Sequence, residues 1–370
     1  MSARRAAAAD GPEATAVTRV LIVEDSPTMR HHLREALAPD PDLEIVGEAP
    51  DGERAVEMTA RLRPDVITMD MMLPGISGLA ATEQIMARHP TPILVVSSAD
   101  RAELFSTYNA LGAGAVEMLE KPHGDDSDAD WPLRLRATLR LVARIRVITH
   151  PRARLDGRVT VPVPPPAARA PTARGKALAV VAVGASTGGP AALTEFLRNL
   201  PAGFPVPVLC VQHIAASEQF AVTFADWLAE QTGRNVRYAT DGAPVGRAAG
   251  QVLLAPPNRH LLVRDQVLRI GAGPPRHSCR PSVDVLFESV AAEFGPLAAG
   301  CLLTGMGRDG AAGLLLMRGR GAVTFAQDEG SCTVYGMPRE AALMGAAAHV
   351  LPPGRMAARL GEMQPSAVGR

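Results

Sequence analysis

Side chains that could form a hydrolytic site follow strand-like runs in the second half of the sequence. The stretch AVVAVGASTGGPAALTEFL, residues 179–197, places Ser186 in a Gly-x-Ser-x-Gly pattern between an apolar run and a helical pattern. A sharp turn at such a junction exposes the serine hydroxyl. A glycine-rich turn at the start of a helix can instead bind a phosphate, or be only a tight turn. The stretch has neither a Gly-Lys-Ser/Thr sequence nor the dinucleotide-binding glycine spacing. Three interpretations of this stretch therefore stay open: Ser186 as a nucleophile, a phosphate-binding turn, and a tight turn without a further role.

Two further strand ends offer partners for Ser186. VPVLCVQH ends in His213, directly after the predicted strand that follows the serine strand, where an imidazole could take the serine proton. CLLTGMGRDGAAG carries Asp309, whose carboxylate could orient that imidazole, and backbone N–H groups near Met306 that could bind an oxyanion. A histidine at a strand end or an aspartate in a glycine-rich turn often has only a local structural role. Other histidines compete for the role of base: His260, His277 and His349.

A second group of reactive side chains lies in the first half of the chain. Glu24 and Asp25 follow the first predicted strand, Asp70 follows the third, Ser97 the fourth and Lys121 the fifth. Because parallel strands end at one edge of a sheet, these groups should converge there. Clustered carboxylates repel one another, and Mg²⁺ prefers such oxygen ligands. An aspartate beside this ion could accept a phosphoryl group, although Asp25 and Asp70 could also only cap helices.

The elements that must position these groups alternate between short apolar runs and amphipathic segments. Five such strand–helix units over residues 18–145 predict a flavodoxin-like parallel sheet with helices on both faces. The alternation resumes over residues 177–356 with strands near 177–184, 205–213, 297–305 and 322–327, and with a hairpin within 251–271. We expect an α/β, doubly wound second domain.

Composition sets the domain boundaries and the class of protein. A chain of 370 residues suits two domains, and the Pro/Arg-rich stretch 146–176 predicts a linker between them. We expect a disordered extension over 1–17 and a tail over 357–370. With a net charge of zero and no apolar run near the ~20 residues of a membrane span, the chain should neither bind nucleic acid nor insert into a membrane.

Cysteine usage indicates the compartment. The four cysteines have no Cys-x-x-Cys spacing, so neither a disulfide framework nor a zinc site is expected, and the cytoplasm is the predicted location. None of them is assigned a catalytic role.

The first domain resembles the receiver domain of bacterial response regulators. The segments IVEDS and MDMMLPGISG carry the resemblance, while Met118 stands where many receivers have Tyr or Phe. The resemblance implies Asp70 as phosphoacceptor, Glu24, Asp25 and Asp70 at a Mg²⁺ ion, and Ser97 and Lys121 as the hydroxyl and the cation of the phosphorylation switch.

The second domain resembles the methylesterase domain of the CheB-type chemotaxis protein-glutamate methylesterases. VGASTGGPAAL, VQHI, LLTGMGRDGAAGL and YGMPREAA carry this resemblance, and RHSCRPSVDVLFESVA does so with Cys279 and Arg280 in a stretch that varies among relatives. The roles that it implies are Ser186 as nucleophile, His213 as base, Asp309 as its orienter, Met306 as backbone oxyanion donor and Thr187 as a lining residue.

Together the two resemblances imply a phosphorylation-regulated serine hydrolase. It would hydrolyse glutamate γ-methyl esters on chemoreceptors, releasing methanol through an acyl-enzyme and without a cofactor, and deamidation of receptor glutamines is a second implied capacity. The receiver would cover the site until a histidine kinase phosphorylates it. Two rivals remain open: a response regulator whose second domain only binds, and a general serine esterase unrelated to receptors.

Overall fold

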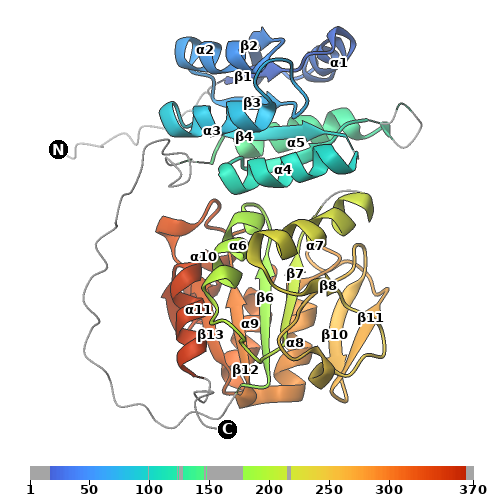
Figure 1. Ribbon diagram of the computed structural model, residues 1–370, viewed down its shortest axis with the longest axis vertical. Coiled ribbons are helices and arrows are strands. Elements are labelled where there is room, and N and C mark those ends of the chain that lie inside the picture. Colours follow the sequence, from blue (N-terminus) through green and yellow to red (C-terminus); the bar gives the residue numbers. More distant parts are fainter. Residues whose placement is uncertain are drawn as a thin grey trace, which may run out of the picture.

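The chain folds into two α/β units, shown one above the other in Figure 1. The computed structural model describes residues 17–98, 100–122, 124, 128–145, 147, 178–214 and 218–363. Nearly all of the predicted extension and linker, and the end of the predicted tail, lie outside these residues. None of the helices described is both long and apolar enough to cross a membrane.

The first domain is the predicted five-stranded parallel sheet, in the order β2-β1-β3-β4-β5. Its strands are β1 (Thr18–Val23), β2 (Leu43–Ala49), β3 (Val66–Met69), β4 (Ile93–Ser97) and β5 (Glu117–Glu120). Its helices are α1 (Pro27–Leu37), α2 (Gly52–Leu62), α3 (Gly78–Arg88), α4 (Arg101–Ala113) and α5 (Trp131–Val142). Side chains of α1 and α5 share one apolar core and those of α2, α3 and α4 another, so both faces of the sheet are covered. The predicted fold class is confirmed.

The second domain is built on a seven-stranded parallel sheet, in the order β14-β13-β12-β6-β7-β9-β8. The strands are β6 (Val180–Ala185), β7 (Val208–Gln212), β8 (Val236–Tyr238), β9 (Val252–Leu254), β12 (Ala298–Leu302), β13 (Val323–Gln327) and β14 (His349–Leu351). One face packs on α6 (Gly189–Asn199), α7 (Glu218–Thr232) and α11 (Pro353–Glu362), and the other on α8 (Val283–Phe294), α9 (Ala311–Gly319) and α10 (Met337–Leu343). The strand order reverses between β6 and β12, and such a reversal opens a crevice at the carboxyl ends of the strands.

Local sequence explains where several helices begin. Ser26, Asp51, Ser77 and Ser282 precede α1, α2, α3 and α8, and each side chain accepts a hydrogen bond from a backbone N–H in the first helical turn. These are the residue types that satisfy the free N–H groups of a helix start. The cap at Ser282 also places α8 against the site described below.

Three details differ from the expectations. The predicted hairpin forms between β10 (His260–Arg264) and β11 (Val267–Gly271), but β9, from the same segment, joins the main sheet. The short strands β8 and β14 carry weak apolar patterns and were not expected. Helix α11 runs past residue 356, because Met356, Ala357 and Leu360 are buried against the sheet.

The two domains meet through α4, which lies over α6 and α7 (Figure 1). Tyr108 on α4 is buried between Phe224 and Trp227 of α7, with ring centroids 5.2 and 5.5 Å away. Its hydroxyl donates to the carbonyl of Phe220 at 2.8 Å, and Asn109 Oδ1 accepts from Trp227 Nε1 at 2.9 Å. A buried tyrosine with its hydroxyl satisfied makes this contact specific.

Replacing Tyr108 by Ala should loosen the contact between the domains. The change removes the ring contacts and a hydrogen bond, and burying aromatic side chains in this way is worth about 3–5 kcal/mol. Hydrogen exchange of the α7 backbone should therefore quicken relative to the native chain. Leu133→Ala, at an exposed residue of α5, is the control, and unchanged exchange in α7 of the Tyr108 variant would contradict the prediction.

Candidate active site and phosphorylation site

Ser186 lies in the turn between β6 and α6, at the carboxyl edge of the sheet. The turn is closed by the N–H of Gly189, which donates to the carbonyl of Ser186 at 2.7 Å. Gly188 has φ of 75°, a left-handed conformation that favours glycine. Gly305, after β12, comes so close that a Cβ there would lie 2.6 Å from Cβ of Ser186. Gly188 thus allows the turn its conformation, and Gly305 leaves space for the Ser186 side chain in the crevice.

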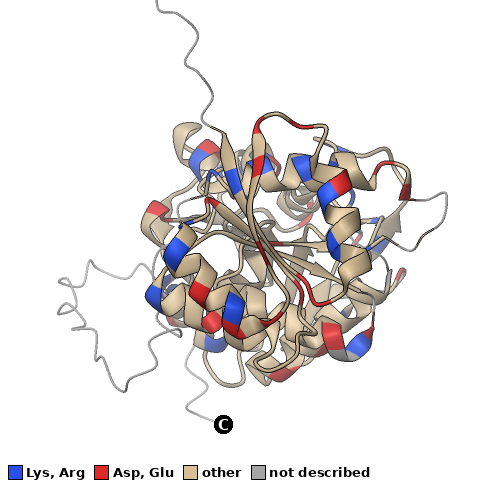
Figure 2. Cartoon of the chain, turned by 90° about the horizontal axis from the view of Figure 1, so that it is seen from above, with Lys and Arg blue, Asp and Glu red and all other residues tan. Residues whose placement is uncertain are grey.

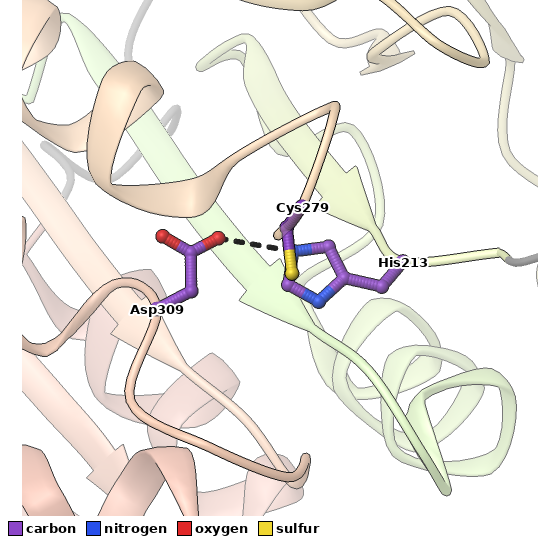
Figure 3. A group of neighbouring side chains, drawn as sticks. All are labelled: His213, Cys279 and Asp309. Carbon is purple, nitrogen blue, oxygen red and sulfur yellow. Dashed lines mark hydrogen bonds and ion pairs between the residues drawn. The ribbon is translucent and has the colours of Figure 1, made fainter. Parts of the chain in front are cut away.

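His213 follows β7, the neighbour of the serine strand, and pairs with Asp309. Its Nε2 lies 3.0 Å from Asp309 Oδ2 (Figure 3). Burial lowers the pKa of His213, but the hydrogen bond to Asp309 and the nearby Cys279 outweigh burial and raise that pKa to about 9. No hydrogen bond joins His213 to Ser186 in the part of the chain that the structure describes, although both line one cavity.

Asp309 is held by the first turn of α8. Its Oδ1 accepts from Ser282 Oγ at 2.8 Å and from the N–H of Asp284 at 3.1 Å, and its Oδ2 accepts from the N–H of Val283 at 2.7 Å. Burial raises the pKa of Asp309, but hydrogen bonds from His213 and from these N–H groups outweigh burial and lower the pKa below its ordinary value. The carboxylate therefore stays ionised and cannot rotate away from the imidazole.

The loop after β12 brings Met306 beside the serine turn. Its side chain is exposed, while the preceding Gly305 touches Ser186. Within the described residues, no acceptor is found for the N–H of Met306, so this group is free to donate to a bound ligand. Thr187 accepts through its carbonyl from Thr304 Oγ1 at 3.0 Å, which ties the serine turn to the same loop.

The first domain closes over this site. The cavity between the domains is lined by Ser186, His213 and Gln212 on one side and by Glu117 and Met118 of β5 on the other. Its volume of about 20 Å³ has room for a water molecule but not for an ester substrate. In this arrangement of the domains the space beside Ser186 is closed to an ester substrate.

Glu117 makes the most direct contact with the crevice. Its Oε2 accepts from Thr187 Oγ1 at 2.7 Å, one residue from Ser186. Burial raises the pKa of this glutamate, so its charged form is disfavoured in the closed arrangement. A receiver carboxyl thus lies beside the serine of the other domain.

The acidic residues of the first domain gather as predicted. Carboxylate oxygens of Glu24, Asp25 and Asp70 lie within 4.8 Å of one another. Lys121 Nζ is 3.0 Å from Glu24 Oε2 and 2.9 Å from Asp70 Oδ1. Burial and the charge of Asp70 outweigh the opposing effect of Lys121 and raise the pKa of Glu24 to about 7. Three oxygen ligands, one of them exposed, fit a hard divalent ion.

Ser97 is connected to the helix that meets the second domain. The serine is buried at the end of β4, and its Oγ accepts from Thr107 Oγ1 of α4 at 2.8 Å. Tyr108, the residue that anchors the contact between the domains, follows directly in the sequence. Ser97 and the contact between the domains thus both involve α4.

The structure gathers the predicted residues into two groups: His213, Asp309, Ser186, Thr187 and Met306 in one, and Glu24, Asp25, Asp70 and Lys121 in the other, with Ser97 on the neighbouring strand end. Of the competing histidines, His260 contacts Ser282 and Pro274, and the ring of His349 lies tilted against Phe325. His277 pairs with Asp284 and also lies near Asp309. Sequence reasoning missed Ser282 and Glu117. The N-cap pattern of α8 could have indicated the first, but no local signal indicates the second.

Comparisons with known proteins agree with this architecture. Residues 181–360 match the family described as CheB methylesterase, and residues 20–127 match the response regulator receiver domain. The protein-glutamate methylesterases/protein-glutamine glutaminases 2 and 3 of Anaeromyxobacter dehalogenans (strain 2CP-C) are similar to this chain. The first is 42% identical over 334 residues, or 90% of this chain and 93% of the relative. The second is 45% identical over 346 residues, or 92% and 98%.

A relative from another organism gives the same result. Protein-glutamate methylesterase/protein-glutamine glutaminase 4 of Myxococcus xanthus (strain DK1622) is 44% identical over 324 residues, which cover 86% of this chain and 89% of the relative. The resemblance stated for both domains is confirmed. The chain belongs to the family of CheB-type protein-glutamate methylesterases/protein-glutamine glutaminases.

Proposed function

We propose that this protein hydrolyses glutamate γ-methyl esters on chemoreceptors, with Ser186, His213 and Asp309 as its catalytic triad. The observation that carries the proposal is the His213–Asp309 pair. It lies where β6, β7 and β12 end, and its imidazole lines the same cavity as Ser186. The names of the relatives supply the substrate class. Deamidation of receptor glutamines is the second activity that these names support.

The first chemical step is attack of Ser186 Oγ on the ester carbonyl. Since His213 Nε2 faces Asp309, Nδ1 is the nitrogen left to take the serine proton. The imidazolium then returns this proton to the leaving methoxide, which departs as methanol. Water hydrolyses the acyl-enzyme by the same route and leaves a glutamate, and a primary amide would lose ammonia in place of methanol.

The free N–H of Met306 is the proposed oxyanion donor. It projects from the loop that touches Ser186, and such a donor stabilises the charge that develops on the carbonyl oxygen. Thr187 lines the same site. An exposed Met306 side chain suits a surface that must receive a receptor helix.

Phosphorylation of Asp70 is proposed to open the site. Glu24, Asp25 and Asp70 would hold the Mg²⁺ ion, which would shield the phosphoryl oxygens while a histidine kinase supplies the phosphoryl group. Lys121 would pair with the new charge, and a movement of Ser97 would reach α4 through Thr107. Displacing α4 would release Tyr108 from α7 and shift the population towards open domains.

The absence of nucleic-acid binding stays an expectation from the composition of the sequence. On the face seen from above in Figure 2, basic and acidic residues are interspersed. The cytoplasmic location stays a prediction.

Replacing Ser186 by Ala should abolish methanol release from methylated receptor, because the nucleophile is lost from a turn that tolerates a methyl group. Ser289→Ala removes a hydroxyl from α8 of the same domain and should retain activity. Methanol release by the Ser186 variant at the native rate would contradict the triad, and inactivity of the native chain towards receptor would favour a domain that only binds.

The choice of base and orienter can be tested by three variants. Asp309→Asn should lower turnover by about 10⁴-fold, if the serine-protease case transfers, because the imidazole loses its orientation and charge partner. His213→Ala should be as severe, whereas His277→Ala, which breaks the pair with Asp284, should not. A larger loss of steady-state turnover in His277→Ala than in His213→Ala would identify His277 as the base.

Asp70→Asn should leave basal esterase activity in place and abolish its rise with a small phosphodonor and Mg²⁺. The amide cannot form the acyl phosphate, and the residue lies far from the esterase chemistry. Asp65→Asn, at the exposed opposite end of β3, should respond like the native protein. Full stimulation of the Asp70 variant would place the phosphoacceptor elsewhere.

Glu117→Ala should raise basal activity without phosphodonor. It removes the hydrogen bond to Thr187, worth about 1 kcal/mol, which corresponds to about a fivefold gain in the open population. Glu117→Gln keeps one oxygen that can accept from Thr187, while its NH₂ group then faces the Met118 N–H that Oε1 now accepts from. Its basal rate should therefore rise less than that of Glu117→Ala. Equal basal rates in the Ala and Gln variants would show that this contact does not hold the domains shut.

A further inference from the structure

Cys279 lies within reach of the proposed catalytic pair. Ligand atoms of His213, Cys279 and Asp309 all lie within 4.8 Å of one another. Figure 3 shows the thiol in front of the edge of the imidazole that faces Asp309. A nitrogen, a sulfur and an oxygen thus converge on one point, the donor set that Zn²⁺ binds in proteins. The proposed reaction uses the first and third of these groups and has no use for the thiol.

We propose that His213, Cys279 and Asp309 form an inhibitory site for Zn²⁺. Four-coordinate zinc places its nitrogen, sulfur and oxygen ligands about 3.4–3.6 Å apart. His213 Nε2 and Asp309 Oδ2 are 3.0 Å apart, so a zinc ion beside this hydrogen bond needs only a small widening. The thiol has to rotate, giving up a weak contact of 3.4 Å to the carbonyl of His277.

The surroundings provide access and an open coordination position. Cys279 and Asp309 line a cavity of about 500 Å³ together with Met306 and Arg308, and none of these four residues lines the narrow cavity shared with Ser186. Cys279 is partly exposed. A metal ion can therefore enter without separation of the domains, and water can fill the fourth position. Three protein ligands with one open place is an arrangement that zinc adopts.

A neighbouring group of similar residues fits a cation less well. His277, Asp284 and Asp309 also lie close together, but Arg276 is 3.9 Å from the Asp284 carboxylate and pairs with Glu288. That group has no thiol, and the guanidinium of Arg276 already lies beside its carboxylates, in the place of a metal cation. The position beside Cys279 is therefore the favoured one.

Binding would remove the base from the reaction. The thiol proton passes to solvent, the single proton of the neutral imidazole moves from Nε2 to Nδ1, and the metal bonds to Sγ, Nε2 and an Asp309 oxygen. With Nδ1 protonated and Nε2 bound to the metal, the imidazole has no nitrogen left to receive the proton of Ser186. Inhibition thus rests on the proposed function, whereas metal binding does not.

Binding is measured first, on the full chain with Co²⁺ in place of Zn²⁺. Excess Mg²⁺ occupies the oxygen ligands of the first domain, and a near-ultraviolet cobalt–thiolate band reports a cysteine ligand. We expect the band in the native chain and in Cys332→Ser, but not in Cys279→Ser. Zn²⁺ should displace the cobalt. Cys279→Ser should bind Zn²⁺ about 100-fold more weakly, because even the loss of a residue that only hydrogen-bonds to a metal ligand lowers metal affinity by about 10- to 100-fold.

Activity is measured second, with each variant compared with its own metal-free rate. Zn²⁺ should inhibit methanol release by the native chain and Cys332→Ser at concentrations that leave Cys279→Ser active. Absence of the cobalt band, or equal zinc affinity in the two cysteine variants, would overturn the site. A band with undiminished esterase activity would overturn only the inhibition and would count against His213 as the base.

Discussion

The site in the second domain depends on one buried carboxylate. Asp309 is 2% exposed, and an ion removed from water to this degree must be matched by donors. The start of α8 supplies two N–H groups and the Ser282 hydroxyl, and His213 supplies the fourth donor. Because this carboxylate has no freedom to turn, the direction of the imidazole is set before any substrate arrives.

The contact between the domains covers the same crevice. A site open enough for a receptor helix is open to any ester, and here it is covered by β5 and by α4 of the receiver. The cover combines an apolar anchor at Tyr108 with a polar contact at Glu117. The side chain of Glu117 ends in the same group that ester hydrolysis leaves on a glutamate. Its burial raises its pKa, so the contact carries a cost that makes closure easier to reverse.

Cys279 adds a chemistry that the esterase reaction does not need. Its position results from the turn at His277 and Ser278, which both have positive φ, and this turn leads directly into the α8 cap that holds Asp309. The residues that orient the carboxylate and the thiol that approaches it are therefore parts of one short segment. A metal that binds there competes with the catalytic arrangement itself.

The sequence by itself determined the strand–helix order, the two parallel sheets and most reactive positions, because strand ends are readable as apolar runs followed by polar residues. Ser186, His213, Asp70 and Lys121 were found in this way. Only the tertiary structure decided which histidine meets Asp309, since His213 and His277 both lie near acidic partners after folding. It also decided the roles of Ser282, Glu117 and Cys279. Their contacts join residues that are 27 to 70 positions apart in the sequence. Such proximity arises from packing, which no local pattern encodes.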